Sequence, residues 1–271
     1  LWSTSGIMVK SPAITDLPLA ERGILLAFYR AVFATITLLP WLRPRAMRWR
    51  VALIPMVCSF AVMNLLYLTA MTRTTAAAST FLQYTSTVWT FLIGVLFLKE
   101  TIDRGTLIAL IGAIAGISWI VSDDWNSLNS FGNLIAIGSG MAYAGVIISL
   151  RQLRTEDAIW LVFLNHVFAM MVLLPWATSS ETTLRAEQWT TLIFLGSVQM
   201  AIPYVMFSIA IRHILSHEAG LMTLIEPLLV PLWVAWAWHE PVNTATWVGG
   251  GLILGSLVLK YAHHARLLVS K

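Results

Sequence analysis

The chain has 271 residues, of which 58% are hydrophobic and only 11% are charged. Soluble domains carry about 25% charged residues, so this composition predicts an integral membrane protein. The formal net charge is +4, but the basic residues lie between apolar runs, which indicates membrane topology rather than nucleic-acid binding. The single cysteine, Cys58, excludes a disulfide framework within the chain.

Apolar runs follow one another along the chain, with short connections rich in Pro, Asp, Asn or Ser. A bilayer core requires about 20 apolar residues per helix. Leu1–Val9 is too short to span, and we expect it to be the end of a helix whose beginning is missing. We therefore predict an all-α membrane protein of ten transmembrane helices, the first one truncated. The nine full spans predicted are Leu19–Trp41, Val51–Met71, Ala76–Leu98, Thr106–Ser122, Gly132–Leu150, Ala158–Thr178, Trp189–Ile211, Ala219–Trp238 and Thr246–Leu268.

Lysine and arginine are divided unequally between the two sides of these spans. With the segment after Trp41 placed in the cytoplasm, twelve basic residues fall inside, four fall outside, and Arg30 lies within a span. This bias predicts a multi-pass protein of the bacterial inner-membrane type, with both termini in the cytoplasm. The inside set is Arg43, Arg45, Arg48, Arg50, Lys99, Arg104, Arg151, Arg154, Arg212, Lys260, Arg266 and Lys271, and the outside set is Lys10, Arg22, Arg73 and Arg185.

The two halves of the chain show a weak internal repeat at a shift of 140 residues. Ser79–Glu100 falls on Ala219–Glu240, and in both halves a glutamate ends the span and a glycine-containing helix follows. Because each half holds five spans, an odd number, the second half must be inverted in the membrane. We predict two inverted five-helix repeats, residues 1–122 and 131–271, a plan common among secondary transporters.

The stretch Ala219–Glu240 combines a length sufficient to cross a bilayer with Glu226, Pro227 and Pro231 near its middle. A carboxylate is costly at membrane depth, and each proline removes one backbone donor. The carbonyls of Thr223 and Pro227 then lack helical partners, which is tolerated where they face protein or water. We predict helix breaks at these two prolines and at Pro203, and a polar path beside this stretch.

Several short motifs indicate a known family. They are Leu1-Trp2-Ser3-Thr4, Arg30 within FYRAVFA, the run Ala76–Val88 leading to Leu98-Lys99-Glu100, and Glu226-Pro227 leading to His239-Glu240. With these motifs the chain resembles the drug/metabolite transporter superfamily, of the ten-helix type with two EamA-like repeats. Within that superfamily it resembles the aromatic amino acid and paraquat-type exporters.

The resemblance implies an exporter of small metabolites and places Trp2 inside the first helix, near a cavity. One position departs from the family pattern, because the proline usual in the fourth helix is replaced by Thr87. Local unwinding, which the family pattern implies for both halves, is therefore supported by a proline only in the second half, at Pro227.

Polar and aromatic residues recur at helical spacing in several spans. In the fourth, Ser79, Gln83, Ser86 and Thr90 share one helical face. Such a stripe indicates a pore-lining wall, and the alternative is hydrogen bonding between packed helices. The cavity-lining residues predicted are Trp2, Asn64, Tyr67, Ser79, Gln83, Tyr84, Ser86, Thr87, Thr90, Ser139, Tyr143, Gln199, Tyr204, Thr223, Glu226 and Trp233.

Two charged residues lie in spans and allow two interpretations. Glu226 is a candidate for proton coupling, since ionisable groups within a membrane are often functional. Alternatively, Arg30 and Glu226 form a static ion pair. His166 is expected to be a packing residue. His213 and His217 lack the further ligands of a metal site, so we expect no metal and no cofactor.

The predicted function is secondary transport by alternating access around a central cavity. The expected partners are a small-molecule substrate, such as an amino acid or a small drug, and the lipid bilayer, with no nucleic acid. The sequence has no GxxxxGK[ST] motif, which argues against direct use of ATP. The alternatives are an intramembrane enzyme, a passive channel, or an exporter of another metabolite, and we do not expect an enzyme.

Overall fold

The computed structural model describes residues 1–43, 47–98, 104–123, 130–210 and 225–269, and every regular element in these ranges is a helix. The predicted all-α class is confirmed. The elements are the 3-10 turn η1 (Trp2–Thr4), α1 (Ser5–Val9), α2 (Pro12–Thr15), α3 (Leu19–Leu38), the 3-10 turn η2 (Leu39–Trp41), α4 (Leu53–Arg73), α5 (Ala76–Gln83), α6 (Ser86–Leu98), α7 (Arg104–Asp123), α8 (Ser130–Gln152), α9 (Ala158–Thr178), α10 (Ala186–Gly196), the π-helical turn η4 (Ser197–Ala201), α11 (Ile202–Ala210), α13 (Ile225–Trp238) and α14 (Thr244–Val269).

Polar side chains mark where several helices begin. The Thr75 hydroxyl accepts a hydrogen bond from the Ala78 amide at 3.1 Å and caps α5. Asp157 caps α9 in the same way through the Trp160 amide, at 3.0 Å. These caps satisfy backbone donors that have no partner within the helix. At the other end of α13, His239 takes a left-handed conformation with φ 52°, which ends the helix and turns the chain.

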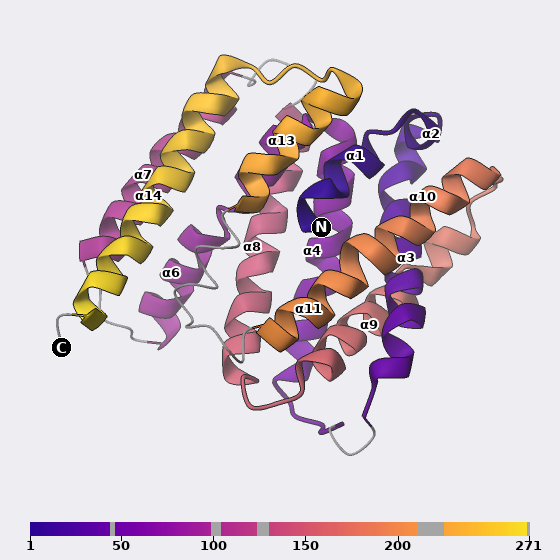
Figure 1. The fold of residues 1–271 in the computed structure, drawn as a ribbon, viewed down its shortest axis with the longest axis horizontal. Helices are drawn as coiled ribbons and strands as arrows, with labels where there is room; N and C mark the ends of the chain where they lie inside the picture. The colour runs from indigo at the N-terminus through magenta and orange to yellow at the C-terminus, as the bar shows by residue number, and fades with distance from the viewer. Residues whose placement is uncertain (44–46, 99–103, 124–129, 211–224, 270–271) are drawn as a thin grey trace.

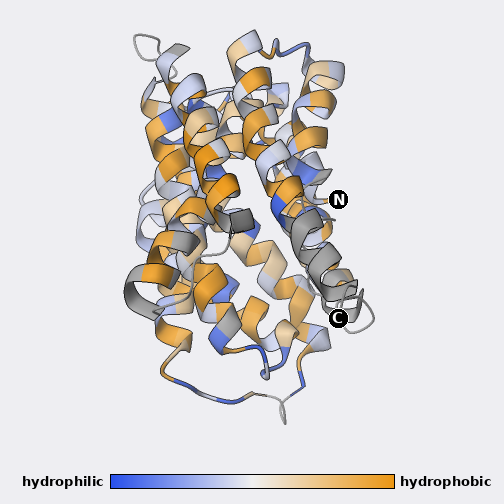
Figure 2. Ribbon diagram, turned by 90° about the vertical axis from the view of Figure 1, so that its left-hand side faces the viewer, coloured by the Kyte–Doolittle hydropathy of each residue, from blue (hydrophilic) through white to orange (hydrophobic). Residues whose placement is uncertain are grey.

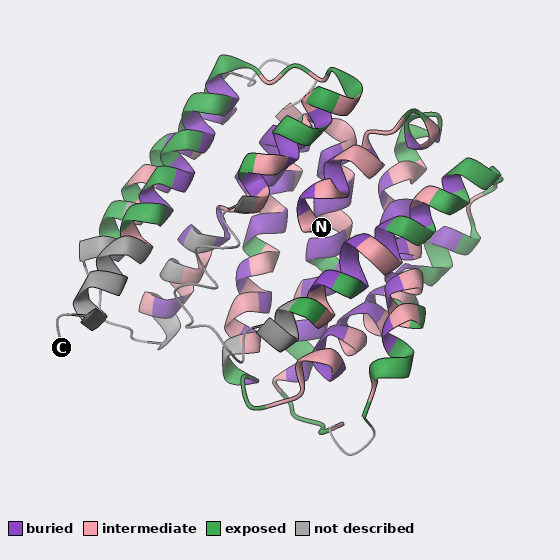
Figure 3. Ribbon diagram, in the orientation of Figure 1, coloured by how far each residue is buried: buried purple, intermediate pink, exposed green. Residues whose placement is uncertain are grey.

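Five helical segments are long and apolar enough to cross a membrane by length and composition. Large apolar side chains cover their outward faces and those of neighbouring helices, as Figures 2 and 3 show by hydropathy and by burial. Ile36, Met171 and Trp236, for example, are 59%, 61% and 76% exposed. An apolar outer surface suits contact with lipid. The five segments are Leu19–Trp41, Leu53–Arg73, Ser130–Leu150, Ala158–Thr178 and Ala186–Met206.

The helices pack as neighbours that are distant in sequence. In Figure 1, α7 and α14 form an antiparallel pair at one side, α3, α9 and α10 lie at the other, and α4, α8 and α13 lie between them. Glycines allow the close approach of α7 to α14. A Cβ atom on Gly112 would lie 2.4 Å from the Cβ of Ser256, and one on Gly116 would lie 2.4 Å from the carbonyl of Gly249.

The described loops fall at two ends of the molecule, as alternating spans require. Loops 47–52 and 153–157 lie at one end together with the C-terminal end of α14, whereas loops 10–18 and 239–243 lie at the other (Figure 1). This grouping matches the two sides used for the charge count. Which side is cytoplasmic stays a prediction.

The predicted fourth span is interrupted, although it contains no proline. Helix α5 ends at Gln83 and α6 begins at Ser86. Unwinding in the first half, which the family resemblance implied but no proline supported, is therefore present at this point. At the interruption, the Thr85 amide donates to the Leu82 carbonyl at 3.1 Å in a tighter turn. Gly140 of α8 explains why the turn fits, because a Cβ there would lie 2.2 Å from the Thr85 hydroxyl and 2.8 Å from the Gln83 carbonyl.

The predicted proline breaks take milder forms. Pro203 lies two residues after the end of the π-helical turn η4, and the helix from Ala186 to Ala210 changes its winding without stopping. Pro231 lies inside α13 and does not end it, which corrects the prediction of a break there. Pro227 is buried in the described part of α13, and the residues before Ile225 lie outside the described ranges, so the predicted break at Pro227 stays a prediction.

Candidate functional site

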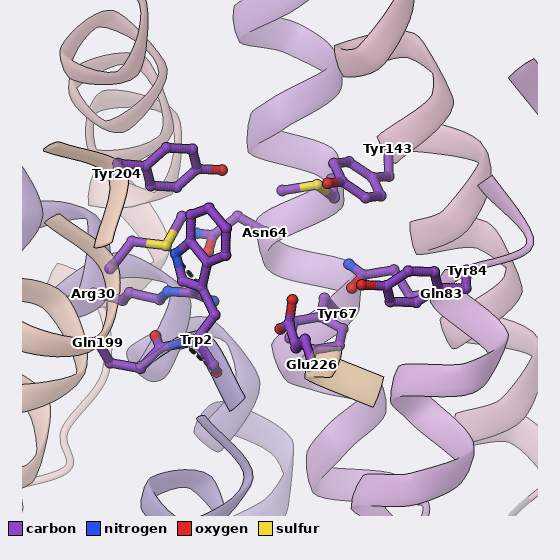
Figure 4. Close-up of a pocket in the computed structure, with 12 residues that line it drawn as sticks. Trp2, Arg30, Asn64, Tyr67, Gln83, Tyr84, Tyr143, Gln199, Tyr204 and Glu226 are labelled. Carbon is purple, nitrogen blue, oxygen red and sulfur yellow. Dashed lines mark hydrogen bonds between the residues drawn. The ribbon is translucent and has the colours of Figure 1, made fainter. Parts of the chain in front are cut away.

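A cavity with a polar and aromatic lining lies where both halves of the chain meet. Its volume is about 70 Å³, enough for several water molecules. Elements η1, α3, α4, α5, α8, η4, α11 and α13 contribute to it. Figure 4 shows the side chains converging from opposite sides. The lining residues are Trp2, Arg30, Met63, Asn64, Tyr67, Gln83, Tyr84, Tyr143, Gln199, Met200, Tyr204 and Glu226.

Two opposite charges reach this cavity without meeting each other. Arg30 is buried, its Nη2 donates to the Met200 sulfur at 2.7 Å, and its Nε has no hydrogen-bond partner among the described residues. Glu226 projects from α13, with Trp2 between it and Arg30 in the view of Figure 4. Within the described ranges, no ion pair joins Arg30 to Glu226. A thioether is a weak acceptor, so the guanidinium keeps hydrogen-bonding capacity for a ligand.

Amide groups complete the polar part of the lining. The Asn64 amide donates to the Ala27 carbonyl at 3.0 Å, which fixes α4 against α3. The Gln199 amide donates to the Trp2 carbonyl at 2.8 Å, while its own oxygen has no partner in the described part of the chain. Since buried polar atoms are normally hydrogen-bonded, the Gln199 oxygen is a ready acceptor for a ligand or a water molecule.

Aromatic rings form the rest of the lining. The rings of Trp2 and Tyr204 pack edge to face with centroids 5.1 Å apart. The Tyr67 hydroxyl lies 3.3 Å from the Thr80 hydroxyl. Tyr84 and Tyr143 face the cavity from the opposite side in Figure 4. Flat rings beside two separated charges suit a small organic molecule that carries both an apolar part and ionic groups.

Comparison with known proteins identifies the family. Residues 1–122 and 130–261 match the EamA-like transporter family. The chain belongs to that family. It is therefore a multi-pass membrane transporter and not an enzyme, and the predicted fold class is confirmed.

Two related proteins and one solved structure show what this EamA-like transporter is similar to. It is 28% identical over 206 residues, 74% of each chain, to an uncharacterized transporter of Archaeoglobus fulgidus. It is 25% identical over 264 residues to the pseudopaline exporter CntI of Pseudomonas aeruginosa, covering 93% of this chain and 89% of that one. A solved crystal structure with 14% identity superposes with a TM-score of 0.68 over 96% of this chain and 92% of the other, which supports the fold.

The structure brings most of the predicted residues of this EamA-like transporter to one cavity, and it adds two. The methionines Met63 and Met200 line the cavity but were not predicted, because nothing in an apolar run distinguishes a lining thioether from a packing one. The predicted residues in the lining are Trp2, Arg30, Asn64, Tyr67, Gln83, Tyr84, Tyr143, Gln199, Tyr204 and Glu226.

Other predicted residues lie elsewhere. Ser79 and Ser139 are fully buried and donate to the carbonyls of Ala76 and Ala136, at 3.0 and 2.7 Å. Serine in a helix commonly bonds its own preceding turn, so polar spacing cannot distinguish a cavity wall from packing. Trp233 is 38% exposed and donates to the Ser3 hydroxyl at 3.2 Å.

Four further predicted residues complete the comparison with the lining. Ser86 is buried and Thr90 is half-buried, and neither lines the cavity. The Thr87 side chain and Thr223 lie outside the described residues.

His166 packs among aromatic rings, and its Nε2 has no hydrogen-bond partner among the described residues. It is buried between Phe60 and Tyr204, with ring centroids 4.8 and 6.4 Å away, and its Nδ1 lies 2.7 Å from the Val162 carbonyl. Among the described residues, no three His, Cys, Asp or Glu side chains gather as metal ligands would. His213 and His217 fall outside the described ranges.

A polar network joins both halves of the chain at the end where Lys10 lies. The Lys10 ammonium is 2.8 Å from one Glu240 oxygen and donates to the Thr74 carbonyl at 2.7 Å. The other Glu240 oxygen accepts from the Ala76 amide at 2.7 Å, at the start of α5. The carboxylate after α13 therefore holds α1 and α5 together.

Apolar packing lies beneath this network. A Cβ on Gly6 of α1 would lie 2.6 Å from Val234 and 3.0 Å from Val230, so α1 sits directly against α13. Val230 and Val234 belong to the same buried cluster as Tyr67, which lines the cavity. A layer of packed apolar side chains thus separates the cavity from the Lys10–Glu240 end.

Proposed function

We propose that this EamA-like transporter exports a small zwitterionic metabolite, of the amino acid type, by alternating access. The observation that supports this substrate class is the pair of opposite charges in one cavity. An amino acid carries a carboxylate that suits the Arg30 guanidinium and an ammonium that suits the Glu226 carboxylate. Charge-assisted hydrogen bonds of this kind are stronger than neutral ones.

The aromatic lining supports a substrate with an apolar or aromatic side chain. Trp2, Tyr67 and Tyr204 surround the two charges (Figure 4). An indole or phenol packs well against such a chain, and its ring face also attracts a cation. Aromatic amino acids and small cationic drugs both fit this description, and the proposal takes the amino acid as the first candidate.

Export as the direction of transport draws on the relatives and on the packing. One relative is named for the export of pseudopaline. In the arrangement of the helices described here, the Lys10–Glu240 network and the apolar layer beneath it close one end. The excess of basic residues at the other end supports a cytoplasmic location there, with both termini inside. A state closed on the outer side is one of the two states that alternating access requires.

Glu226 has a second candidate role in proton coupling. Its carboxylate faces the cavity without an ion-pair partner among the described residues. A static pair with Arg30 would have explained both charges, and the structure lacks that pair. A carboxylate that binds either a proton or a substrate ammonium can exchange one for the other across the transport cycle.

Transport by purified protein in liposomes tests the proposal. Labelled phenylalanine or tyrosine should enter in a saturable manner, and unlabelled amino acid should compete. Competitors with a blocked amine (N-acetyl) or a blocked carboxylate (amide) should be at least about tenfold weaker, since each loses one charge-assisted contact. Equal competition by the blocked compounds, or no flux for any amino acid, contradicts the substrate class.

The coupling role needs a separate measurement. An imposed pH gradient should drive flux in the parent protein and have no effect in Glu226→Gln. The matched control is Ser79→Ala, which removes a polar group that is buried outside the cavity lining. Flux that is indifferent to pH in the parent removes the coupling role and leaves the substrate proposal standing.

A further inference from the structure

A second, larger depression lies between α4 and α9 and shares no lining residue with the central cavity. Its volume is about 610 Å³, within the range of small-molecule sites, about 300–1,000 Å³. Both helices are among the segments long and apolar enough to cross a membrane. The lining residues are Trp49, Arg50, Val51, Leu53, Ile54, Val57, Leu164, Val167, Phe168 and Met171. We call this depression the α4–α9 groove.

The α4–α9 groove has a packed floor and open walls. Leu53 and Val57 are 3% and 9% exposed, so they form part of the core. Ile54, Val51 and Met171 are 62%, 83% and 61% exposed and border the opening. Apart from Arg50 and the indole nitrogen of Trp49, every lining side chain is apolar. A groove of this kind on a spanning helix pair faces hydrocarbon.

One end of the groove is basic and is held in place. Arg50 Nε lies 2.5 Å from Glu156, whose side chain is only 2% exposed, while 53% of the Arg50 side chain remains accessible. The contact is an ion pair without the alignment of a hydrogen bond. Arg43, Arg48 and Arg154 are also exposed at this end of the molecule. The hydrophilic residues of this end appear in blue in Figure 2.

Contacts with α9 hold the loop before α4 in place and leave the Trp49 side chain of this loop exposed. Trp160 at the start of α9 donates through its indole to the Arg48 carbonyl at 3.2 Å. Its ring packs edge to face on Trp49, with centroids 5.5 Å apart. Trp49 itself remains 76% exposed. An exposed indole beside arginines is the arrangement that favours the boundary between hydrocarbon and headgroups.

We propose that the α4–α9 groove binds an anionic phospholipid. One acyl chain lies along the apolar floor, and the phosphate lies against the guanidinium of Arg50 and its exposed neighbour Arg48. Charge complementarity carries this assignment, because a groove that took lipid for its apolar surface alone would not need a basic end. Guanidinium groups suit phosphate geometry, and basic pockets between spanning helices bind anionic headgroups. The site is independent of the proposed substrate.

Native mass spectrometry of the full-length chain in detergent tests this assignment, with phosphatidylglycerol and phosphatidylcholine as probes. The parent protein should retain phosphatidylglycerol more tightly than phosphatidylcholine. The variant Arg48→Gln/Arg50→Gln/Glu156→Gln removes both cations without leaving the buried carboxylate unpaired. It should bind phosphatidylglycerol about fivefold more weakly, because the loss of two cations and one carboxylate lowers the local charge by one.

Two matched controls separate headgroup binding from general effects of charge and folding. Arg185 pairs with Asp16 at 2.5 Å, and this exposed pair lies outside the groove. Arg185→Gln/Asp16→Asn should therefore leave lipid retention unchanged. Met171→Trp narrows the groove and should weaken retention, whereas Ile36→Trp, on the equally exposed face of α3, should not.

Three results would overturn the proposal. The first is equal retention of the two lipids by the parent protein. The second is an unchanged affinity for phosphatidylglycerol in the arginine variant. The third is a dimeric parent protein, seen as a mass of two copies, that Met171→Trp converts to a monomer while lipid binding is unaltered. The groove would then be an interface between copies of this chain.

Discussion

The helix interrupted between α5 and α6 and its counterpart in the second half, α13, reach the cavity by different means. The first contains no proline, yet it stops at Gln83 and restarts at Ser86. The second contains Pro231 and runs without interruption from Ile225 to Trp238. Gln83 and Tyr84 enter the cavity from the interruption, while Glu226 enters from the first turn of α13. Proline content therefore does not by itself decide where a helix stops, since Pro231 lies inside α13 and no proline lies at the break after Gln83. Residues 216–223, which the 140-residue shift places on α5, lie outside the described ranges.

Packing against α8 explains the interruption between α5 and α6 better than the local sequence does. Gly140 of α8 lies against the turn at Thr85, where no side chain would fit. In α13, by contrast, the residues around Pro231 pack on α1 through Gly6. The four predictions below test this comparison, from the largest expected effect to the smallest.

Gly140→Ala should destabilise the protein by about 3 kcal/mol, because its Cβ would meet both the Thr85 hydroxyl and the Gln83 carbonyl. The change should also displace Gln83 and Tyr84, so transport should fall along with the melting temperature in detergent. Gly251→Ala is the matched control, since nothing lies within 4 Å of its Cβ position. It should stabilise α14 slightly, by up to about 1 kcal/mol. Equal melting temperatures for the two variants would remove Gly140 as the cause of the interruption.

Glu226→Gln should reduce the affinity for a zwitterionic substrate by about 30-fold, which corresponds to about 2 kcal/mol for one charge-assisted contact. The melting temperature should change little, because Glu226 has no ion-pair partner among the described residues. Competition for labelled amino acid in liposomes measures the affinity. Unchanged competition would mean that α13 contributes shape and not charge to the cavity. The contrast between a charged side chain from α13 and the uncharged Gln83 and Tyr84 would then have no effect on binding.

Lys10→Gln should weaken the link between α5 and α13 at the Lys10–Glu240 end. Its ion pair with Glu240 is only 17% and 18% exposed, and partly buried pairs are worth about 1 kcal/mol or more. A cysteine placed at Ser79 or Thr80, both buried in the N-terminal half of α5, should react several times faster with a polar thiol reagent in this background. Cys58→Ser removes the native thiol first. An unchanged labelling rate contradicts the role of this pair in closing its end of the molecule.

Thr87→Pro should have the smallest effect, below about 1 kcal/mol, because Thr87 lies in the first turn of α6 where the backbone donor has no helical partner. Val95→Pro, inside the same helix, should cost about 3 kcal/mol or more. Melting temperatures and transport of the two variants give the comparison. A Thr87→Pro protein as unstable as Val95→Pro would show that α5 and α6 behave as one continuous helix.

Much of the fold follows from the length and spacing of apolar runs. The predicted span Ala158–Thr178 has the same bounds as α9, since Asp157 before it is a typical cap. The residues of the fourth span alone did not predict the interruption after Gln83, because it depends on Gly140, which lies far away in the sequence. Tertiary packing overrides local preference at that point.

The sequence predicted those lining residues of the cavity whose polar or charged side chains are costly to place in a membrane. Arg30, Asn64, Gln199 and Glu226 could be predicted because polar groups of this size need a partner or an aqueous space. Ser79 was predicted to line the cavity and does not, because its hydroxyl donates to a carbonyl of its own helix. Serine side chains commonly form such bonds, so their spacing is a weak guide to a cavity. Met200 gave no signal at all, because its role depends on its contact with Arg30.

The Glu240 carboxylate has a consequence for the kinetics of opening. One of its oxygens binds Lys10 and the other accepts from the Ala76 amide, so a single side chain ties α13 to α1 and to α5. Separation of α13 from either helix strains both contacts at once. Opening is then a concerted event whose barrier is concentrated at one residue, and Glu240→Gln should change the turnover rate far more than the apparent affinity for the transported molecule.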